Sequence, residues 1–599
     1  MALQTGRGLG AGRLFGRGYV LQKFRALLVT GTVSSVTGYL ALWIGNVTAG
    51  NLLGEEALAS IALVAPFHTL MAFCSLLVAS GAATLMAMAS GAGDKDAVDR
   101  VFSEGLLLAV MAGALLCVAS VLLREPLLTM FGAAGPERAG ARAYLANLSL
   151  YALCMPVESL LFVTLLNDGD NRRVNIGIGV QLAVVAVLDV ALSGRLGIGA
   201  ISLSPAIACA LNILLLSTHF YKKGGSIRFV PGARFRPKEA LRIFKFSASD
   251  ACGPLLVSLS TLVLNRILLR TFGSGALVTF SVIVNLETVV VTGFDGVGAA
   301  IQPMIGVFYG EQSAGGLKRT MRLAKRVAIA ESAAATVLVL LLAGRLPALY
   351  GITDPALVDS TAHAARLFAL SFLPAGLNLL YSSYYMYIDR VPLALANALL
   401  RSFALLQLMA LLLALLNRQP VFFLAFPIAE CLALLDTLLL ARWFAGRGRK
   451  RKREREREGG GLTVPLLLDA AEAARSAVFD CPADAENVMR MRGEAEAFLS
   501  GHGVERRAML RILLTVEEYG MSVAERNPGG RTNLFCDLSL SDDGVRLIFR
   551  DDGAPCDAAD LSAVSGAAAE AARTRLIADS GQRNEYGRII GDNRTVFLF

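Results

Sequence analysis

Apolar runs recur along the first three quarters of the chain, separated by short polar loops. An apolar run of about 20 residues, coiled into a helix, matches the thickness of a bilayer's hydrocarbon core. The pattern therefore predicts a mainly α-helical polytopic membrane protein with two six-helix lobes. The twelve expected spans are 28–48, 57–85, 101–123, 145–166, 175–193, 197–220, 250–270, 276–308, 326–343, 362–387, 392–416 and 420–443.

The two halves of this pattern resemble each other. The first contains GAATLMAMASGAGDKDAVDRVF (Gly81–Phe102), and the second contains GAAIQPMIGVFYGEQSAGGLKRTM (Gly298–Met321). Each passage places a Gly-rich, apolar helix end before a short polar loop, and then opens the next helix with charged residues. A polytopic chain built from two like halves is the usual plan of a secondary transporter, whose binding site lies between the halves.

Composition and charge placement agree with a membrane protein. Of the 599 residues 55% are hydrophobic and 18% charged, and the mean hydropathy is +0.56. The net charge is +9, but much of the excess lies in the loop 221–249 and in the run Arg447–Arg457, both beside predicted helices. Basic loops of this kind orient a membrane protein and meet anionic lipid. They predict cytoplasmic termini and contact with membrane lipid, and no nucleic-acid partner.

The start of the chain and its cysteines indicate where the protein is located. No signal peptide is recognisable in the Gly/Arg-rich start, and the nine cysteines show no pairing pattern, which favours a reducing compartment. We expect a monomer in the plasma membrane.

The hydropathy pattern divides the chain into six parts. They are an N-terminal cytoplasmic segment (1–24), the first lobe (25–220), a basic inter-lobe loop (221–249), the second lobe (250–445), a charged and Gly-rich linker (446–461) and a soluble domain (462–599).

The last 138 or so residues read as a small cytoplasmic α+β sandwich. Residues 484–500 and 504–526 are predicted amphipathic helices, and residues 531–540 and 545–550 alternate like strands on either side of the turn 541–544. A further helix near 565–579 and a final strand near 593–599 complete the expected domain.

Residues 25–445 resemble the multidrug and toxic compound extrusion (MATE) family of cation-coupled exporters. The resemblance rests on several short passages in the family's order. They are Leu53-Gly54 with Ala57-Leu58-Ala59, Asn167-Asp168-Gly169-Asp170-Asn171-Arg172-Arg173, Leu188-Asp189 followed by Leu196-Gly197-Ile198-Gly199-Ala200, and Gln302-Pro303-Met304-Ile305-Gly306 with Tyr309-Gly310.

The resemblance implies a cation-coupling site in the first lobe, centred on Asp189. The family's usual Asp of the first helix is replaced by Gly45, so Asn46 beside it is the candidate to ligate a cation or orient Asp189. Intramembrane carboxylates are costly and normally serve a cavity or a partner. Glu287 and Asp295 lie eight positions apart on one predicted helix, near the same face, and are candidates for a cation or substrate subsite in the second lobe.

Other intramembrane residues are secondary candidates. Glu158, Glu430 and Asp436 are further intramembrane carboxylates, and Arg266, Arg270 and Arg401 are candidate partners of Glu287 and Asp295. Polarisable and aromatic side chains suit bulky aromatic cations, although most such residues in membrane helices only pack. The candidate cavity residues are Met71, Tyr381, Gln302 and Tyr309.

The soluble domain resembles the histidine-kinase-type ATPase fold in its anti-sigma-factor form. Leu514–Glu518 is similar to the family's acidic helix, and Arg550–Pro555 to its adenine-reading turn. The implied nucleotide site would use Glu518, Ser522, Asp551 and Gly553. However, Ser522 stands where the family has a magnesium-binding Asn, and AAAEAARTR (567–575) replaces the Gly-rich phosphate loop, so a degenerate fold used for protein contact is the favoured interpretation.

The expected function is export of amphipathic, cationic compounds by proton or sodium antiport, with a regulatory tail that can contact a protein partner. No cofactor is required, ATP and magnesium are only an option for the tail, and the chain is not expected to be an enzyme. No Walker-type loop is present, which argues against an ATP-driven pump. Two alternatives stay open: a membrane sensor whose transporter-like part controls the tail, and a lipid-carrier flippase.

Overall fold

The computed structural model describes residues 18–131, 137–221, 227–230, 236–350, 352, 354–455, 476–527, 532–541, 544–555, 577, 581 and 583–599. The chain forms two compact units. One contains residues 26–312 and 321–468, and is helical. The other contains the soluble domain together with residues 1–25 and 313–320.

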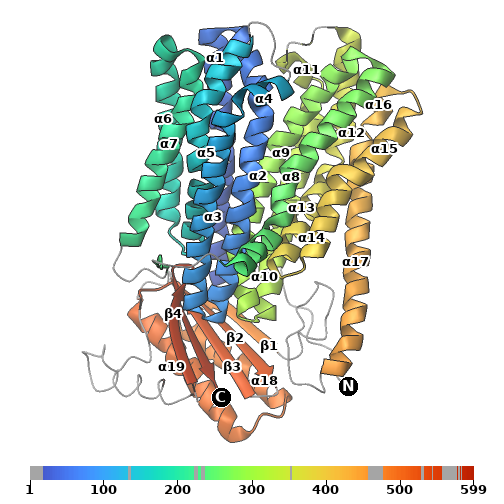
Figure 1. The fold of residues 1–599 in the computed structure, drawn as a ribbon. Helices are drawn as coiled ribbons and strands as arrows, with labels where there is room; N and C mark the ends of the chain where they lie inside the picture. The colour runs from blue at the N-terminus through green and yellow to red at the C-terminus, as the bar shows by residue number, and fades with distance from the viewer. Residues whose placement is uncertain are drawn as a thin grey trace. The chain divides into compact units, whose positions relative to one another are not determined.

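The first lobe is built from long helices at the predicted spans, several of which extend seven to nine residues beyond the predicted ends (Figure 1). α2 ends in a left-handed glycine, Gly93, and the carboxylate of Asp94 accepts a hydrogen bond from the backbone N–H of Ala97 to start α3. Asp170 caps α6 in the same way. The elements are α1 (Tyr19–Leu53), α2 (Glu55–Ala92), α3 (Lys95–Leu122), α4 (Arg124–Met130), α5 (Glu137–Asn167), α6 (Asn171–Leu196), α7 (Ile198–Ser217) and η2 (Thr218–Tyr221).

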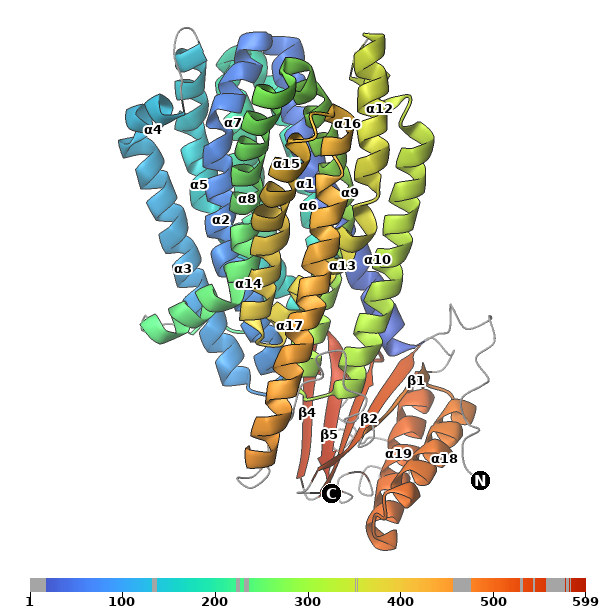
Figure 2. The same ribbon diagram turned by 90° about the vertical axis from the view of Figure 1, so that its right-hand side faces the viewer.

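The second lobe has more interruptions (Figure 2). Its tenth predicted span is broken into α12 and α13, bent by 44°. Its eleventh contains a π-helical turn, η3. The elements are α8 (Pro237–Phe272), α9 (Ser274–Gly310), α10 (Ala314–Leu342), α11 (Leu346–Leu349), α12 (Pro355–Ala369), α13 (Phe372–Tyr387), α14 (Val391–Leu399), η3 (Leu400–Ala404), α15 (Leu405–Ala414), α16 (Gln419–Phe422) and α17 (Ala425–Arg455).

The predicted class is confirmed, but the number of spans differs. Among the described residues, ten helices are long and apolar enough to cross a membrane, or eleven if the bent pair is one span. The ninth predicted span, 326–343, lies in α10. That helix is not among the ten, because Arg326 and Glu331 lie in the span itself and Lys318, Arg319, Arg322 and Lys325 lie before it. The predicted inter-lobe loop is also shorter, since α8 already begins at Pro237.

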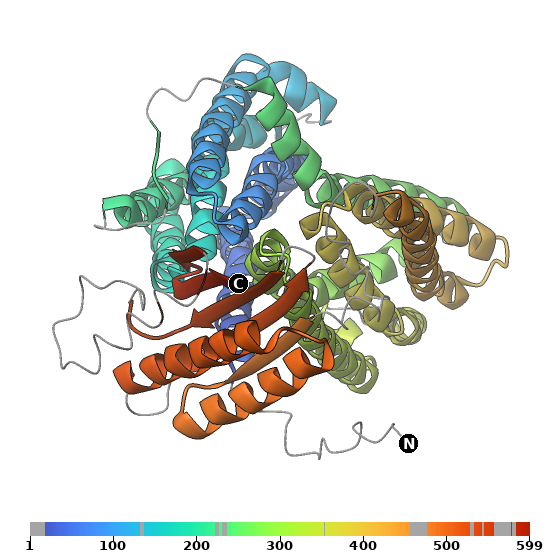
Figure 3. The same ribbon diagram turned by 90° about the horizontal axis from the view of Figure 1, so that it is seen from below.

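Each lobe has its own apolar core. The first-lobe core gathers Val64, Phe67 and Met71 of α2 with Leu145 and Leu148 of α5. An aromatic cluster fills the second-lobe core, in which the rings of Phe368, Phe372, Phe423 and Phe426 pack edge-to-face or stacked. Viewed along the helices in Figure 3, the helices of unit 2 form two groups, blue to cyan and green to orange.

The soluble unit is an α+β domain, as predicted. Its sheet has the order β1-β2-β3-β5-β4 and is antiparallel throughout. The hairpin predicted around residues 541–544 is present, with Ser541 paired to Gly544. Two helices lie side by side on one face of the sheet (Figure 3). The elements are β1 (Ser476–Pro482), α18 (Ala485–Gly501), α19 (Arg506–Arg526), β2 (Asn533–Ser541), β3 (Gly544–Asp551), β4 (Arg583–Ile589) and β5 (Asp592–Leu598).

Candidate functional site

Asp189 of α6 is a fully buried carboxylate of the first lobe. Its side chain is 0% exposed, and neither carboxylate oxygen has a hydrogen-bond partner among the described residues. The hydroxyl of Ser204 lies close enough to interact with this carboxylate, but its hydrogen bond is to the carbonyl oxygen of Ala200, at 2.9 Å. A buried carboxylate without a partner is costly, and such a residue within a membrane helix marks an ion or substrate pathway.

Gly45 of α1 faces this carboxylate. A Cβ atom built on Gly45 would lie 3.7 Å from Oδ2 of Asp189, so the position predicted to replace the family's first-helix Asp does adjoin Asp189. Asn46 is exposed, in contrast with the buried Gly45. Because consecutive helical residues point about 100° apart, Asn46 does not share the direction of Gly45.

Glu158, another buried carboxylate of the first lobe, is bonded within the lobe. The side-chain amide of Asn212 on α7 donates to Oε1 of Glu158 at 2.6 Å. This hydrogen bond between α5 and α7 explains why a carboxylate can be buried at Glu158. No such bond is present at Asp189 among the described residues.

The second lobe brings four carboxylates and one guanidinium within electrostatic range. Arg401 of η3 interacts with Glu287 and Asp295 of α9 and with Glu430 of α17, and Asp295 also interacts with Asp250 of α8. The sequence analysis identified Glu287, Asp295 and Glu430, and the structure brings them together. With four acids and one base, the cluster favours positive charge.

Asp250 is the residue that sequence reasoning missed. The predicted helix began at residue 250, which made this carboxylate look like a helix end, whereas α8 begins 13 residues earlier at Pro237. Its Oδ2 accepts a hydrogen bond from Ser80 of α2 at 2.5 Å. The contact joins the two lobes, since α2 belongs to the first and α8 to the second.

Arg401 and Glu430 form the best-defined ion pair of the second lobe. Glu430 receives Nε and NH2 of Arg401 at 3.0 and 2.9 Å and the amide of Asn378 at 2.7 Å. The side chains of Arg401 and Glu430 are 13% and 12% exposed. Arg401 lies on the π-helical turn, a feature often found at functional sites. The pair explains how Arg401 is held beside Glu287 and Asp295.

We expect Arg401→Leu to destabilise the chain by about 3–5 kcal/mol, because it leaves Glu430 buried without its cation. The measurement is the thermal unfolding of the purified chain in detergent. Lys245→Leu is the matched control, since Lys245 and its partner Asp389 are 52% and 44% exposed and such pairs contribute at most about 1 kcal/mol. Equal shifts in the two variants would contradict a structural role for the buried pair.

The two lobes meet at closely packed glycines, which we name the glycine contact: Gly91 of α2 with Gly306 and Gly310 of α9. A Cβ atom on Gly91 would lie 2.1 Å from the carbonyl oxygen of Val307, and one on Gly310 would lie 2.0 Å from that of Met88. The contact is reciprocal between the two passages that sequence analysis found to be similar. It brings the backbones of α2 and α9 as close as helices can pack.

The four predicted cavity residues lie in different surroundings. Met71 is 0% exposed within the first-lobe core, where packing alone accounts for it. Gln302 donates to the backbone oxygen of Ser80 at 3.3 Å, in the region where the lobes meet. Tyr381 stacks on Tyr385, with the ammonium of Lys325 at 5.1 Å from its ring. Tyr309 is half-buried near Asp389 and Arg390.

The predicted nucleotide residues of the tail are partly engaged within the domain. Asp551 accepts hydrogen bonds from the amide of Asn593 at 2.8 Å, from the backbone N–H of Gly553 at 3.1 Å and from the hydroxyl of Tyr519 at 3.3 Å. Burial raises the pKa of the Asp551 carboxyl above its usual range. Glu518 and Ser522 lie one turn apart on α19 and are half-buried. The replaced phosphate loop and the helix predicted near 565–579 lie, apart from Ile577, outside the described residues.

The helical unit and its paired lobes define a multi-pass membrane protein with the MATE transporter fold. A multidrug resistance MATE transporter of the MOP superfamily, solved in an outward-facing conformation, is similar over 72% of this chain and 98% of its own, with 18% identity and a TM-score of 0.67. A MATE protein in complex with MaD3S gives the same values. A MOP superfamily transporter from Pyrococcus furiosus, described as having a binding pocket of reverse polarity, covers 71% and 96% at 17% identity, with a TM-score of 0.66.

The sequence itself carries a narrower match. The MatE family model matches residues 32–191, a segment that contains α2, α3 and Asp189. No curated protein matches the chain significantly.

Proposed function

We propose that this chain is a MATE-type secondary transporter that exports amphipathic organic cations in exchange for protons or sodium ions. The observation that carries the proposal is the isolated, fully buried carboxylate of Asp189 inside a two-lobed MATE fold. A site that binds a cation in only one of two states shifts the balance between those states.

Asp189 is the coupling group in this account. When it is charged, its burial is unfavourable, so it favours the state in which water or a sodium ion can reach it. Binding of a proton or sodium ion removes the net charge and lets α6 pack against α1 and α7. Gly45 leaves room at this place, because it puts no side chain opposite the carboxylate.

The acidic cluster of the second lobe is the proposed substrate subsite. Glu287 and Asp295 supply the negative charge that an organic cation would meet, and Arg401 is restrained by Glu430. The guanidinium then limits the net charge of the cluster without neutralising it. An anionic or lipid-linked substrate would be disfavoured there, which argues against the flippase alternative.

The glycine contact is the proposed gate on one side of this site. It lies next to the loops that follow α2 and α9, on the side that basic loops predict to be cytoplasmic. With the lobes closed here, substrate would leave toward the opposite side. Opening the contact would expose the site to the cytoplasm.

The proposal is tested by competition between substrate and coupling ion. We expect a fluorescent organic cation such as ethidium to bind the purified chain in detergent, and its apparent affinity to fall as protons or sodium ions are added. An exchanger must bind the two in competition or in alternate states. Undiminished dye binding across wide ranges of pH and sodium concentration would refute coupled exchange. The sensor alternative predicts binding without any gradient-driven transport.

A further inference from the structure

The tail's sheet has two buried faces, and α18 and α19 cover only one of them. Along β2 the side chains of Leu534 and Cys536 pack into the core beneath these helices, whereas Phe535 between them points the other way. This second face is as well buried as the first: Phe535 is 0% exposed, and Ile548 and Arg550 of β3 are each 1% exposed. A sheet face with arginine and aspartate side chains buried on it needs partners of matching polarity.

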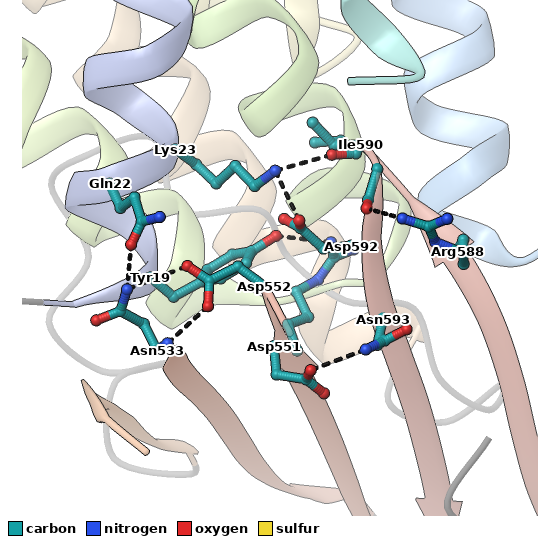
Figure 4. Close-up of polar contacts among 12 residues, drawn as sticks. Tyr19, Gln22, Lys23, Asn533, Asp551, Asp552, Arg588, Ile590, Asp592 and Asn593 are labelled. Carbon is teal, nitrogen blue, oxygen red and sulfur yellow. Dashed lines mark hydrogen bonds and ion pairs between the residues drawn. The ribbon is translucent and has the colours of Figure 1, made fainter. Parts of the chain in front are cut away.

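The start of α1 supplies one set of partners. Residues 18–25 belong to the same compact unit as the tail. The ammonium of Lys23 lies 2.7 Å from Oδ1 of Asp592 and donates to the carbonyl oxygen of Ile590 at 3.0 Å (Figure 4). The ring of Tyr19 packs 5.9 Å from that of Phe535, and Gln22 accepts a hydrogen bond from Asn533.

The start of α10 supplies a second set. Ser313, just before this helix, donates to the carboxylate of Asp537. Arg319 donates to the carbonyl oxygen of Val478 at 3.3 Å. Gly315 lies so close to β1 that a Cβ atom there would be 2.0 Å from the side chain of Val478. Residues 313–320 also belong to the tail's compact unit.

Asp480 of β1 holds both segments at once. Its Oδ1 accepts the backbone N–H of Tyr19 at 2.5 Å, which caps the free N-terminus of α1, and its Oδ2 pairs with Arg319 at 3.1 Å. Gly18 makes the cap possible, because a Cβ atom there would lie 2.8 Å from Oδ1. One carboxylate therefore contacts the first helix of the first lobe and a helix of the second.

We propose that the second face of the tail's sheet is an intramolecular docking surface whose occupants are the start of α1 and the start of α10, and that docking acts as a brake on transport. The two segments continue into different lobes. Lobes that alternate between two states must move relative to each other. A small domain that holds one helix end from each lobe in a fixed arrangement favours one of those states. The glycine contact is closed in the structure that has both segments docked, so the favoured state is the closed one.

The test reverses the charges of the Lys23–Asp592 pair in the full-length chain. Lys23→Asp and Asp592→Lys each place like charges together, whereas the double variant restores the attraction. Spin labels at Arg25 and Arg490, both exposed and within the tail's unit, report docking through their distance distribution. We expect one narrow distance in the parent and the double variant, and a broad distribution in each single variant.

Transport is measured on the same proteins in proteoliposomes. We expect each single variant to move dye about fivefold faster than the parent, the lower end of usual coupling between two sites, and the double variant to return to the parent rate. Asp480→Asn, which keeps the shape of the side chain, is a second undocking variant with the same expected direction. Lys245→Asp, at an exposed pair within the helical unit, is the control and leaves both readouts unchanged.

The outcomes separate this inference from the proposed function, on which only its transport effect rests. A narrow distribution of distances between the labels at Arg25 and Arg490 in both single variants would refute the proposed docking. A broad distribution together with an unchanged or slower rate of dye transport would refute the proposal that docking slows transport. A narrow parent distance in a chain that moves no dye would support docking and refute the proposed transport.

Discussion

We expect Asp189→Asn to abolish the dependence of dye transport on an imposed proton or sodium gradient, and to lower its rate about tenfold or more. A tenfold change corresponds to about 1.4 kcal/mol of lost bias between the two states. The substitution keeps the size of the side chain and removes its charge at every pH. The lobe then no longer distinguishes the ion-bound from the ion-free state. Initial rates in proteoliposomes with and without each gradient provide the measurement.

Glu158→Gln is the matched control for this prediction. Glu158 is a buried carboxylate of the same lobe, and its oxygen accepts from Asn212, a hydrogen bond that the glutamine oxygen can keep. We expect gradient-driven transport to survive in this variant. If the Asp189 variant responded to both gradients like the parent, Asp189 would have no part in coupling.

The second large effect is expected at the glycine contact. Gly91→Ala and Gly310→Ala each add a Cβ atom about 2 Å from a backbone carbonyl oxygen of the other lobe, a distance that only movement of the backbone can relieve. We therefore expect the lobes to be held apart at this end and transport to fall about tenfold or more. Spin labels at Asp96 on α3 and Lys245 on α8, one on each lobe, should move to longer distances.

Gly38→Ala and Gly179→Ala test whether the effect is specific. Both glycines lie within first-lobe helices, and a Cβ atom at either would meet nothing within 4 Å. We expect both variants to keep the parent's distances and transport rate. If Gly91→Ala and Gly310→Ala also left the distances between the lobes unchanged, the contact would not be a gate.

The sequence was sufficient to predict the membrane class and the two lobes, whereas the contact between the glycine-rich passages is a finding of the structure. Periodic apolar runs report burial in lipid directly, and the similarity of the two glycine-rich passages indicates two like halves. Alignment of short motifs placed Gly45 where the family has its first-helix Asp, and in the structure a Cβ atom on Gly45 would lie 3.7 Å from Oδ2 of Asp189.

Other features depended on information that local patterns do not contain. Asp250 was missed because hydropathy does not reveal where a helix begins in the aqueous phase, and α8 starts 13 residues before the apolar run. The expected partners of Arg401 were Glu287 and Asp295, whereas its ion pair is with Glu430, since η3 and α17 meet only in the folded lobe.

The tail illustrates the same limit. The hairpin of β2 and β3 was predicted from its turn, but β1 and β4 were not, because neither has a turn motif or clean alternation beside it. The docking surface could not be predicted from the sequence, because residues 18–25, 313–320 and 476–482 come together only in the tertiary structure.

The most direct test of the central claim is ethidium transport by the purified wild-type chain in proteoliposomes, under a proton or a sodium gradient imposed in either direction. We expect dye to move against its own gradient, to reverse direction when the ion gradient is reversed, and to stop when an ionophore removes that gradient. Dye movement that ignores both gradients, or no movement by a chain shown to be inserted and folded, would contradict a cation-coupled exporter.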